Sequence, residues 1–529
     1  MKHTFNHLRT YITPAQSGFL PNHSTVTQLL DLYHNIQEEL DERKEMYVLF
    51  CDISKAFDRT SHKGIITKLF QMGIRGPFLN LFKNYLSDRK QRVTIGGEFS
   101  KWLPIKAGIP QGSVLGPLLF LVFINDIGCN INFGLRLFAD DATHSHASIN
   151  LIMDEPEIQT DINGLIFWGN KWEVTYSEIK TEHMIMSRRA NRTHLNINMN
   201  NAIIREVNTH AHLGLILNNK ATWHDHVSNL ITKADKKLGI LKKLKYKCDR
   251  NTLLTIYTSY VRSVLEYSDV VWDNIPQDLV NRLETIQIDA LRCITGITIS
   301  ASRDNLYKET GLLPLAKRRK LHRLVMFYKI VQGLAPSYLQ RLLPNTAANR
   351  HQHNIRENRL TPFLCHTESF QRSFFPQTTR DWNSLPPEIK IKPTVSAFKL
   401  ALSRQPEFNT VTPPPWFNSG SRPENVYITR MRNSCSALSF DLFTNHVIDS
   451  PVCRNCNLNV NETSAHYLLD CPKFEEERKV LRIDVATITN SPVFLNPGNL
   501  LCGGSLLSSE QNSSIFVALS KFIKDSRRF

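Results

Sequence analysis

The sequence predicts an α+β fold organised around a buried sheet whose strands end on acidic residues. Met46–Cys51 is an uninterrupted apolar run that stops at Asp52. Such a run, with β-branched and aromatic members, predicts a strand buried on both faces. Residues 135–139 repeat the pattern with one exception and stop at the acidic pair Asp140-Asp141. Stretches with apolar residues at helical spacing surround both runs, and they predict the helices that pack against the sheet.

Two neighbouring strands that end on carboxylates would bring three negative charges together. Like charges repel, so such an arrangement favours a divalent cation among them. Oxygen-only ligand sets suit Mg²⁺, which keeps several waters and completes its shell with phosphate oxygens. Asp52, Asp140 and Asp141 therefore predict a site for phosphoryl transfer with two Mg²⁺ ions, one activating the attacking oxygen and one stabilising the leaving group.

Three other stretches near these strands predict local structure. Residues 26–40 have helical spacing behind a Ser-Thr cap at 24–25, and residues 64–86 predict one amphipathic helix. Residues 89–95 predict a basic strand that turns at Gly96-Gly97. A solvated basic edge strand is the plain structural interpretation of this segment.

Length and charge bound the class of protein. A chain of 529 residues exceeds one hydrophobic core, and we expect two to four domains. The formal charge of +16 favours a polyanionic partner, nucleic acid before an acidic membrane. The longest apolar run, Val114–Ile124, is too short to span a bilayer. The ten cysteines are mostly scattered singly, which indicates a reducing compartment. We expect an intracellular protein of the nucleus or cytoplasm with no membrane partner.

Three motifs, in order, resemble motifs A, B and C of reverse transcriptases. They are Asp52–Asp58, Gly108–Pro117 and Phe138–Asp141, and they are most similar to those of non-LTR (LINE-type, Jockey-like) retrotransposons. An isolated acidic pair occurs on many solvated turns, so the order and spacing of all three motifs make the resemblance specific. It implies a right-hand polymerase of fingers, palm and thumb. It further implies an RNA-directed DNA polymerase, a nucleotidyltransferase that extends a DNA primer at its target on an RNA template from deoxynucleoside triphosphates.

The resemblance also assigns roles to single residues. It implies that Asp52 and Asp140 hold the Mg²⁺ ions with Asp141 close by, and that Gln111 and Gly112 line the pocket of the incoming nucleotide. Asp58 is the less certain acid and is expected to be structural, while the Ile53 carbonyl could join the ion shell.

Two further roles have a plain structural alternative. Phe57 matches the position of a bulky side chain beneath the incoming sugar, where a ring excludes a 2′-hydroxyl; the alternative is core packing. Lys180 matches a lysine close to the departing pyrophosphate; the alternative is an exposed lysine at a strand start. His212 lies in a segment that resembles the family's primer grip and is a weak candidate for direct chemistry.

The resemblance predicts a division of the chain into segments. Gln16–Thr25 is similar to the family's fingers, but members usually carry Arg at the position of Leu20, and a still earlier fingers segment is missing. We therefore expect an N-terminally truncated chain. The expected segments are incomplete fingers and palm (1–225), a helical thumb (226–300), a helical post-thumb region (301–404), a linker (405–425) and a C-terminal domain (426–529). Lysines between 233 and 247 either contact phosphates or form a solvated helix face.

The C-terminal domain carries a metal-ligand pattern. Cys453, Cys456, His466 and Cys471 have the spacing Cys-x2-Cys-x9-His-x4-Cys. Four nitrogen and sulfur ligands fit one tetrahedral Zn²⁺ site, and the pattern resembles the Cys-Cys-His-Cys module at the C-terminus of these retrotransposons. The alternative is a loop of reduced cysteines and a histidine.

Two other functions stay open from the sequence. One is an inactive or fragmentary retroelement protein that keeps the acids, has incomplete fingers and acts only as a nucleic-acid-binding protein. The other is an RNA-dependent RNA polymerase, which Phe57 and Phe138-Ala139 disfavour.

Overall fold

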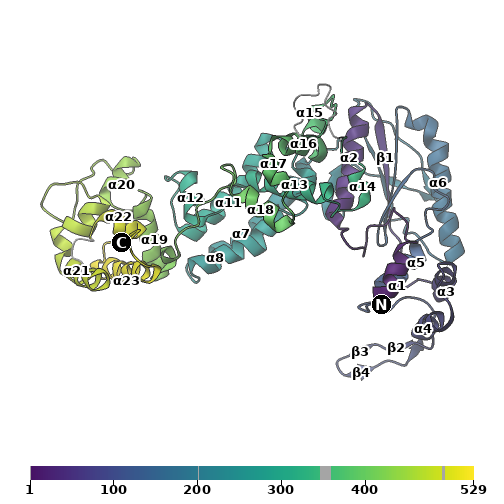
Figure 1. Ribbon diagram of the computed structural model, residues 1–529, viewed down its shortest axis with the longest axis horizontal. Coiled ribbons are helices and arrows are strands. Elements are labelled where there is room, and N and C mark those ends of the chain that lie inside the picture. The colour runs from purple at the N-terminus through teal and green to yellow at the C-terminus, as the bar shows by residue number, and fades with distance from the viewer. Residues whose placement is uncertain (1, 201, 346–358, 491–494) are drawn as a thin grey trace. The chain divides into compact units, whose positions relative to one another are not determined.

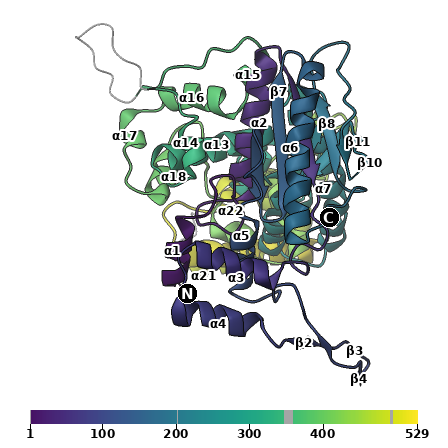
Figure 2. The same cartoon turned by 90° about the vertical axis from the view of Figure 1, so that its right-hand side faces the viewer.

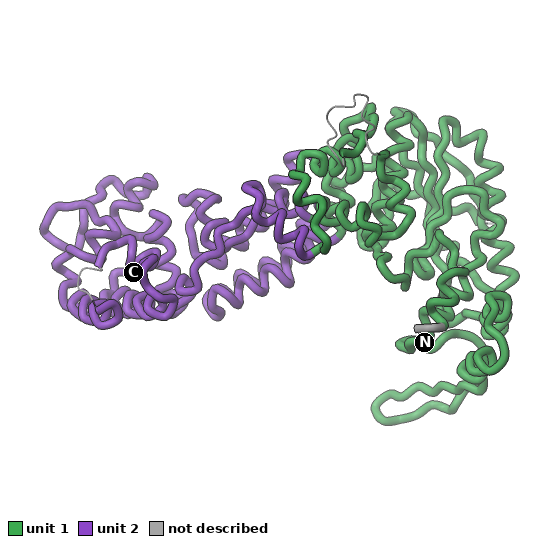
Figure 3. The backbone as a smooth tube through the Cα atoms, viewed as in Figure 1, with its two compact units in different colours: residues 1–226, 268–275, 322–395 green, residues 227–267, 276–321, 396–529 purple. Residues whose placement is uncertain are grey.

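The computed structural model describes residues 2–200, 202–345, 359–490 and 495–529. The chain folds as mixed helices and strands, as predicted, and divides into two compact units (Figure 3). Unit 1 comprises residues 1–226, 268–275 and 322–395, and unit 2 comprises residues 227–267, 276–321 and 396–529. Within the described ranges, no helix combines the length and apolar character needed to cross a membrane.

A five-stranded sheet forms the centre of unit 1, with strand order β11-β8-β1-β7-β6. The middle strand, β1 (Glu45–Cys51), is buried along its whole length, which confirms the predicted burial on both faces. It is antiparallel to both neighbours. The other strands of the sheet are β6 (Gly134–Phe138), β7 (Asp141–Ser148), β8 (Glu182–Met186) and β11 (Arg205–Glu206).

Helices cover both faces of this sheet. Tyr47, Leu49 and Cys51 on β1 share one core with α5 (Gly116–Ile124) and α6 (Leu151–Trp172). Figure 1 shows α2 (Thr25–Asp41) on the side of the strands opposite α6. The predicted cap of α2 is confirmed, because Ser24 and Thr27 exchange side-chain and backbone hydrogen bonds.

The predicted helix 64–86 is wrong as a single element. The structure has α3 (His62–Gln71) and α4 (Gly76–Leu86). Gly73, at φ +85°, adopts the left-handed conformation that ends α3, and Pro77 then lies in the first turn of α4. Apolar spacing continues across this break, which is why periodicity alone joins the two helices.

The predicted basic strand and turn are present as a short-stranded ribbon. It consists of β2 (Lys90–Gln91) paired with β5 (Leu103–Pro104), and β3 (Thr94–Ile95) paired with β4 (Glu98–Phe99). Gly96-Gly97 forms its tip, with positive φ at both residues. Figures 1 and 2 both show this ribbon extending away from the sheet of unit 1.

Later parts of the chain return to cover α2. Phe370 and Phe375 pack on the ring of His34, with ring centroids 5.7 and 4.8 Å away. Phe370 lies on α15 (Glu368–Gln371) and Phe375 lies on α16 (Phe374–Ser384). The remaining elements of unit 1 are α1 (Lys2–Arg9), β9 (Asn198–Met199), β10 (Ala202–Ile203), β12 (Thr209–His212), β13 (Leu215–Asn218), α10 (Asp269–Trp272), α14 (Ser337–Gln340) and α17 (Pro387–Lys390). Helix α13 (Leu315–Val331) belongs to both units.

Unit 2 is helical, and the helical character predicted for residues 226–300 is confirmed. Its long helix α11 (Gln277–Thr295) ends at Gly296 with φ +78°. The others are α7 (His224–Leu244), α8 (Arg250–Ile256), η1 (Tyr257–Val261), α9 (Arg262–Leu265), α12 (Arg303–Thr310), α18 (Val395–Ser403), η2 (Pro415–Asn418), α19 (Arg422–Arg432), α20 (Ser439–Thr444), η3 (His466–Asp470), η4 (Pro472–Phe474), α21 (Glu475–Thr489), α22 (Pro497–Cys502) and α23 (Ser509–Ser526).

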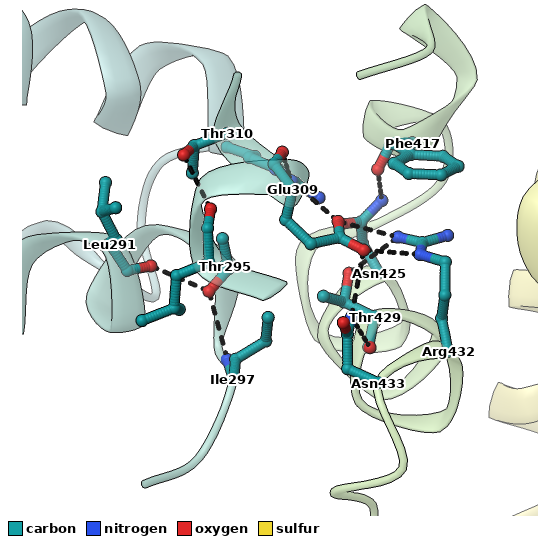
Figure 4. Close-up of polar contacts among 12 residues, drawn as sticks. Leu291, Thr295, Ile297, Glu309, Thr310, Phe417, Asn425, Thr429, Arg432 and Asn433 are labelled. Carbon is teal, nitrogen blue, oxygen red and sulfur yellow. Dashed lines mark hydrogen bonds and ion pairs between the residues drawn. The ribbon is translucent and has the colours of Figure 1, made fainter. Parts of the chain in front are cut away.

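A buried ionic cluster joins α8, α12 and α19. The Glu309 carboxylate accepts hydrogen bonds from Arg432 at 2.7 and 3.1 Å, from Asn433 at 3.0 Å and from Arg250 at 2.9 Å. Figure 4 shows Arg432 and Asn433 pointing at Glu309. Burial alone would raise the pKa of Glu309, but the two guanidinium groups hold it below its usual value. The carboxylate is therefore charged at neutral pH and fixes α19 against α12.

Candidate active site and metal-binding cluster

The sheet brings the three predicted acids to one end of neighbouring strands. Cys51 of β1 pairs with Ala142 of β7, so the next residue, Asp52, lies beside Asp141. Phe138 of β6 pairs with Asp141, which leaves Ala139 and Asp140 as the two-residue loop of that hairpin. Two stretches about ninety residues apart in sequence thus converge, as the strand pattern predicts.

The carboxylates influence one another electrostatically. Partial burial raises the pKa of Asp141 to about 6, and the charges of Asp140 and Asp52 add to the effect. The side chain of Asp141 keeps access to solvent, while the surrounding strands and turn remove part of its hydration. Burial and the charge of Asp52 also raise the pKa of Asp140. A cation would relieve this crowding.

The acidic edge is open rather than a closed cage. Within the described ranges, the three carboxylates do not form a compact metal-ligand group, in which all ligand atoms would lie within 4.8 Å of one another. Asp141 is exposed and the side chain of Asp52 is 37% exposed, so water and phosphate oxygens, the ligands that Mg²⁺ retains in proteins, can reach this edge. The ammonium of Lys180 reaches this edge, with Nζ 3.6 Å from the Asp52 carboxylate. Thr181, the next residue, accepts a hydrogen bond at 3.3 Å from the backbone N–H of Asp52.

A buried glutamine holds the loop that carries Asp140. The Oε1 atom of Gln16 accepts hydrogen bonds from the backbone N–H groups of Ala139 at 2.9 Å and Gly18 at 2.7 Å. Its Nε2 atom donates to the Ala139 carbonyl at 3.3 Å. Ala139 has φ +56°, an uncommon conformation for a residue with a side chain. A Cβ on Gly18 would lie 2.2 Å from the Ala139 nitrogen, so only glycine permits this approach.

Motifs A and B contact each other through backbone and side chains. Gly108, at φ +92°, donates to the Thr60 carbonyl at 2.8 Å, and a Cβ there would meet the Asp58 carbonyl. The Asp58 carboxylate accepts a hydrogen bond at 3.1 Å from Nε2 of Gln111. This contact gives Asp58 a structural role. Gly112, at φ +77°, borders open space.

The ring of Phe57 is half-buried. One face stacks on Phe120 of α5, with centroids 4.4 Å apart and planes 13° apart. Phe19 meets Phe57 edge-on at 6.2 Å. Packing therefore fixes the ring in one orientation and leaves part of it accessible.

His212 is buried, and burial keeps its imidazole neutral. Burial, with a smaller effect of His210, lowers the pKa of His212 to about 3. Its Nε2 atom lies 3.4 Å from the Thr143 hydroxyl. A neutral, buried imidazole of this kind packs the sheet.

Comparison with known proteins identifies the region that holds this site. Residues 1–224 match the family described as reverse transcriptase (RNA-dependent DNA polymerase). The region that contains the acidic edge is therefore similar to reverse transcriptases. Over 329 residues it is 25% identical to the probable RNA-directed DNA polymerase from transposon BS of Drosophila melanogaster, covering 59% of this chain and 36% of that protein. Over 352 residues it is 24% identical to the RNA-directed DNA polymerase from mobile element jockey of the same species, covering 64% and 37%.

These relatives confirm the resemblance to Jockey-like, non-LTR retrotransposon polymerases. The chain spans about a third of the length of the relatives it matches. Among solved structures, apo telomerase from Candida tropicalis aligns at a TM-score of 0.35 with 11% identity, covering 64% of this chain and 54% of that chain. No functional conclusion follows from a likeness this low.

Outside residues 1–224, the four predicted metal ligands form a compact cluster. The ligand atoms of Cys453, Cys456, His466 and Cys471 all lie within 4.8 Å of one another. The Sγ atoms of Cys453 and Cys471 are 4.0 Å apart, and Sγ of Cys456 is 3.5 Å from Nε2 of His466. A tetrahedral zinc ion with ordinary bond lengths would separate two sulfurs by about 3.8 Å and sulfur from nitrogen by about 3.5 Å. The residues therefore fit the ion.

Two charged residues that the sequence pattern does not predict support this cluster. Arg478 is fully buried, and its guanidinium donates to the carbonyls of Leu468 at 3.0 Å and Cys471 at 2.7 Å. The buried Glu462 accepts two hydrogen bonds at 2.7 Å from Arg528. Each lies close in sequence to a metal ligand, but nothing in the local pattern marks it as buried. The same holds for Gln16, whose role depends on a contact 123 residues away.

Proposed function

We propose that this chain is an RNA-directed DNA polymerase of a non-LTR retrotransposon, which extends a DNA primer on an RNA template from deoxynucleoside triphosphates. The supporting observation is the convergence of Asp52 with Asp140 and Asp141 at one end of the sheet, within a region that matches reverse transcriptases. We also propose that the protein works inside the cell, in the nucleus or cytoplasm, because none of its ten cysteines forms a disulfide.

Asp52 and Asp140 would hold two Mg²⁺ ions, with Asp141 beside them and the Ile53 carbonyl as a further oxygen. When bound, the ions would activate the primer 3′-hydroxyl and neutralise charge on the leaving pyrophosphate. Lys180 is exposed and within 3.6 Å of Asp52, a position from which its ammonium can stabilise or protonate the departing group.

The pocket for the incoming nucleotide would form between motifs A and B. Gln111 is oriented by Asp58, and the open space at Gly112 lets a nucleotide approach the backbone. Phe57, fixed on Phe120, would lie beneath the sugar and exclude a 2′-hydroxyl. In this proposal the sheet is the palm, the β2–β5 ribbon belongs to the fingers, and the helices of residues 226–300 form the thumb. The Cys453, Cys456, His466 and Cys471 cluster would bind Zn²⁺, which stabilises the small domain around it.

Primer extension by the purified chain tests this proposal. The substrate is a DNA primer annealed to an RNA template, offered deoxynucleotides with Mg²⁺ present or chelated. Asp140→Asn, which keeps the shape of the side chain, should abolish incorporation. Glu157→Gln, an exposed carboxylate of α6 in the same domain, should leave it unchanged. Absence of incorporation with intact duplex binding would instead support a protein that only binds nucleic acid.

A further inference from the structure

A cavity of about 610 Å³ lies within unit 2, lined by the C-terminal parts of α7 and α11 and by α19. Its charged lining is one-sided. Among the described residues, the lining includes one carboxylate, Asp289, and five cations: Lys242, Lys245, Arg292, Arg422 and Arg430. That carboxylate is shared, since Lys242 lies 3.8 Å and Arg292 3.9 Å from it.

Part of this charge has a structural use. Arg422 donates to the carbonyls of Lys245 at 3.3 Å and Cys293 at 3.0 Å, and Arg430 donates to the carbonyl of Gly296 at 2.7 Å. Cations at the C-terminal ends of helices are favourable because they meet unpaired carbonyls there. Capping α7 and α11 in this way accounts for the position of two of the arginines.

In the described part of the chain, two donor atoms of the arginines that line the cavity remain without an acceptor. Nη1 of Arg422 and Nε of Arg292 are buried and have no hydrogen-bond partner within the described ranges. Burial, with the neighbouring cation Arg250, lowers the pKa of Arg422, so its charge is held at a cost. Buried donors without acceptors are uncommon in folded proteins. An anion with several oxygens in the cavity would offset the surplus of positive charge on its lining.

The wall of the cavity is fixed before any ligand binds. Helix α19 is held by the contacts of Arg432 and Asn433 with Glu309 (Figure 4). A Cβ on Gly296, at the end of α11, would lie 2.5 Å from Val426 of α19, so the two helices approach closely there. Because the helices are already in place, binding of a ligand carries no free-energy cost for positioning them.

An aromatic ring at the cavity indicates what kind of anion fits. Tyr246 lines it, is 80% exposed, and lies against the ammonium of Lys245, 4.6 Å from the ring centroid. Phosphate-binding cations beside an exposed aromatic ring are the combination that single-stranded nucleic acids use, with phosphates on the cations and an unpaired base on the ring. A base inside a duplex cannot stack in this way.

We propose that this cavity binds single-stranded nucleic acid, with phosphates on Arg292, Arg422 and Lys242 and an unpaired base against Tyr246. The choice of nucleic acid among phosphate-bearing ligands rests on the proposed polymerase function. The site lies outside residues 1–224 and needs none of the acids of the polymerase site.

Fluorescence anisotropy with the full chain and a labelled 12-nucleotide oligouridylate, without Mg²⁺ or nucleotides, tests the proposal. Asp289→Asn should raise the affinity severalfold, because among the described residues it removes the only carboxylate of the lining. Asp278→Asn makes the same charge change on the first turn of the same helix and should have little effect. Lys242→Gln should weaken binding and reduce the salt slope by about 1. Lys243→Gln, at an exposed position outside the cavity, is its matched control.

Asp289→Asn and Asp278→Asn change the net charge equally, so a gain of affinity confined to Asp289→Asn is specific to the cavity. Equal effects of Asp289→Asn and Asp278→Asn would overturn the proposal. A 4-thiouridine oligonucleotide gives a second measurement, with cross-links expected on peptides that contain Tyr246 or residues 422–430. Cross-links confined to unit 1, or competition by inorganic pyrophosphate with no dependence on strand length, would also overturn it. None of these outcomes requires polymerase activity, so failure of this proposal and failure of the proposed function are distinguishable.

Discussion

The side-chain amide of Gln16 binds the backbone of Ala139 on both sides of its Cα, accepting from its N–H at 2.9 Å and donating to its carbonyl at 3.3 Å. Ala139 precedes Asp140, so the position of a proposed metal ligand depends on a residue from the start of the chain. Gln16 touches no substrate in the proposed mechanism and is a positioning residue.

Gln16→Leu should therefore reduce kcat for primer extension at least about tenfold, because the loop that carries Asp140 loses its fixed geometry. It should also lower the free energy of unfolding by about 2–3 kcal/mol, since two buried N–H groups lose their acceptor. Steady-state kinetics with a Mg²⁺ titration and urea denaturation measure both effects. A higher Mg²⁺ requirement is the readout that a purely structural role would not produce.

Gln28→Leu is the matched control for this variant. Gln28 is also buried, at 2% exposure, but neither atom of its amide has a hydrogen-bond partner within the described ranges. Its replacement should leave kcat unchanged and should not destabilise the protein. Equal losses of kcat in both variants would contradict the positioning role of Gln16.

The stability of unit 1 should fall as pH drops below about 6.5. His34 is buried against Phe363, Phe370 and Phe375, and this burial lowers the pKa of His34 to about 4 despite an opposing effect of Asp31. The pKa is lower in the folded than in the unfolded state. The unfolded chain therefore binds a proton first, and stability is full above the unfolded value and declines below it. At pH 5 this histidine alone should cost roughly 2 kcal/mol.

Urea denaturation at pH 7.5 and pH 5.0 measures this effect. His34→Phe suits the aromatic surroundings and should reduce the difference in unfolding free energy between the two pH values. His224→Gln changes an exposed histidine and should leave the difference as it is in the wild type. An unchanged difference in His34→Phe would show that other groups govern the acid response.

The Cys-Cys-His-Cys cluster should depend on Arg478. This guanidinium is inaccessible to solvent and binds the carbonyls of Leu468 and Cys471, which orients the turn between His466 and Cys471. Arg478→Met should lower the zinc content per chain and reduce stability by about 3 kcal/mol, because buried carbonyls lose their donor. Metal analysis after dialysis and thermal unfolding with and without a chelator measure these effects.

Arg482 provides the control on the same helix. Its side chain is 47% exposed and pairs with Glu475 at 2.8 Å. An exposed ion pair contributes at most about 1 kcal/mol, so Arg482→Met should keep both the zinc and the stability. Loss of zinc in both variants would indicate a general effect on α21.

Sequence reasoning predicts the parts of the site that local patterns encode. The apolar runs that stop at Asp52 and Asp140 predict converging strands, because strand burial and strand ends are visible in a few residues. The contact of Gln16 with Ala139 is not predictable in this way, since a single polar residue has no period and its partner lies far along the chain. The same reason hides Arg478 and Glu462.

Other features are visible in the sequence but are weaker than the patterns around them. Gly73 and Pro77 signal the break between α3 and α4, although apolar spacing runs through both helices. Ser508 and Gln511 form a capping box at the start of α23. Long-range polar contacts cannot be predicted without the fold, whereas caps and helix breaks are encoded by neighbouring turn residues.

The variant Phe57→Ala distinguishes a role of this ring in substrate selection from a role in packing alone. Its ring is stacked on Phe120 and half-buried, so Phe57→Ala removes bulk from the proposed nucleotide pocket. If the ring excludes a 2′-hydroxyl, the variant should incorporate ribonucleotides at least about tenfold more efficiently relative to deoxynucleotides, a change of about 1.4 kcal/mol in discrimination. Single-nucleotide extension with each nucleotide type gives the ratio of kcat/KM. Phe19→Ala removes the edge-on neighbour of Phe57 and should leave that ratio unchanged, while equal losses of both activities in Phe57→Ala would assign the ring to packing.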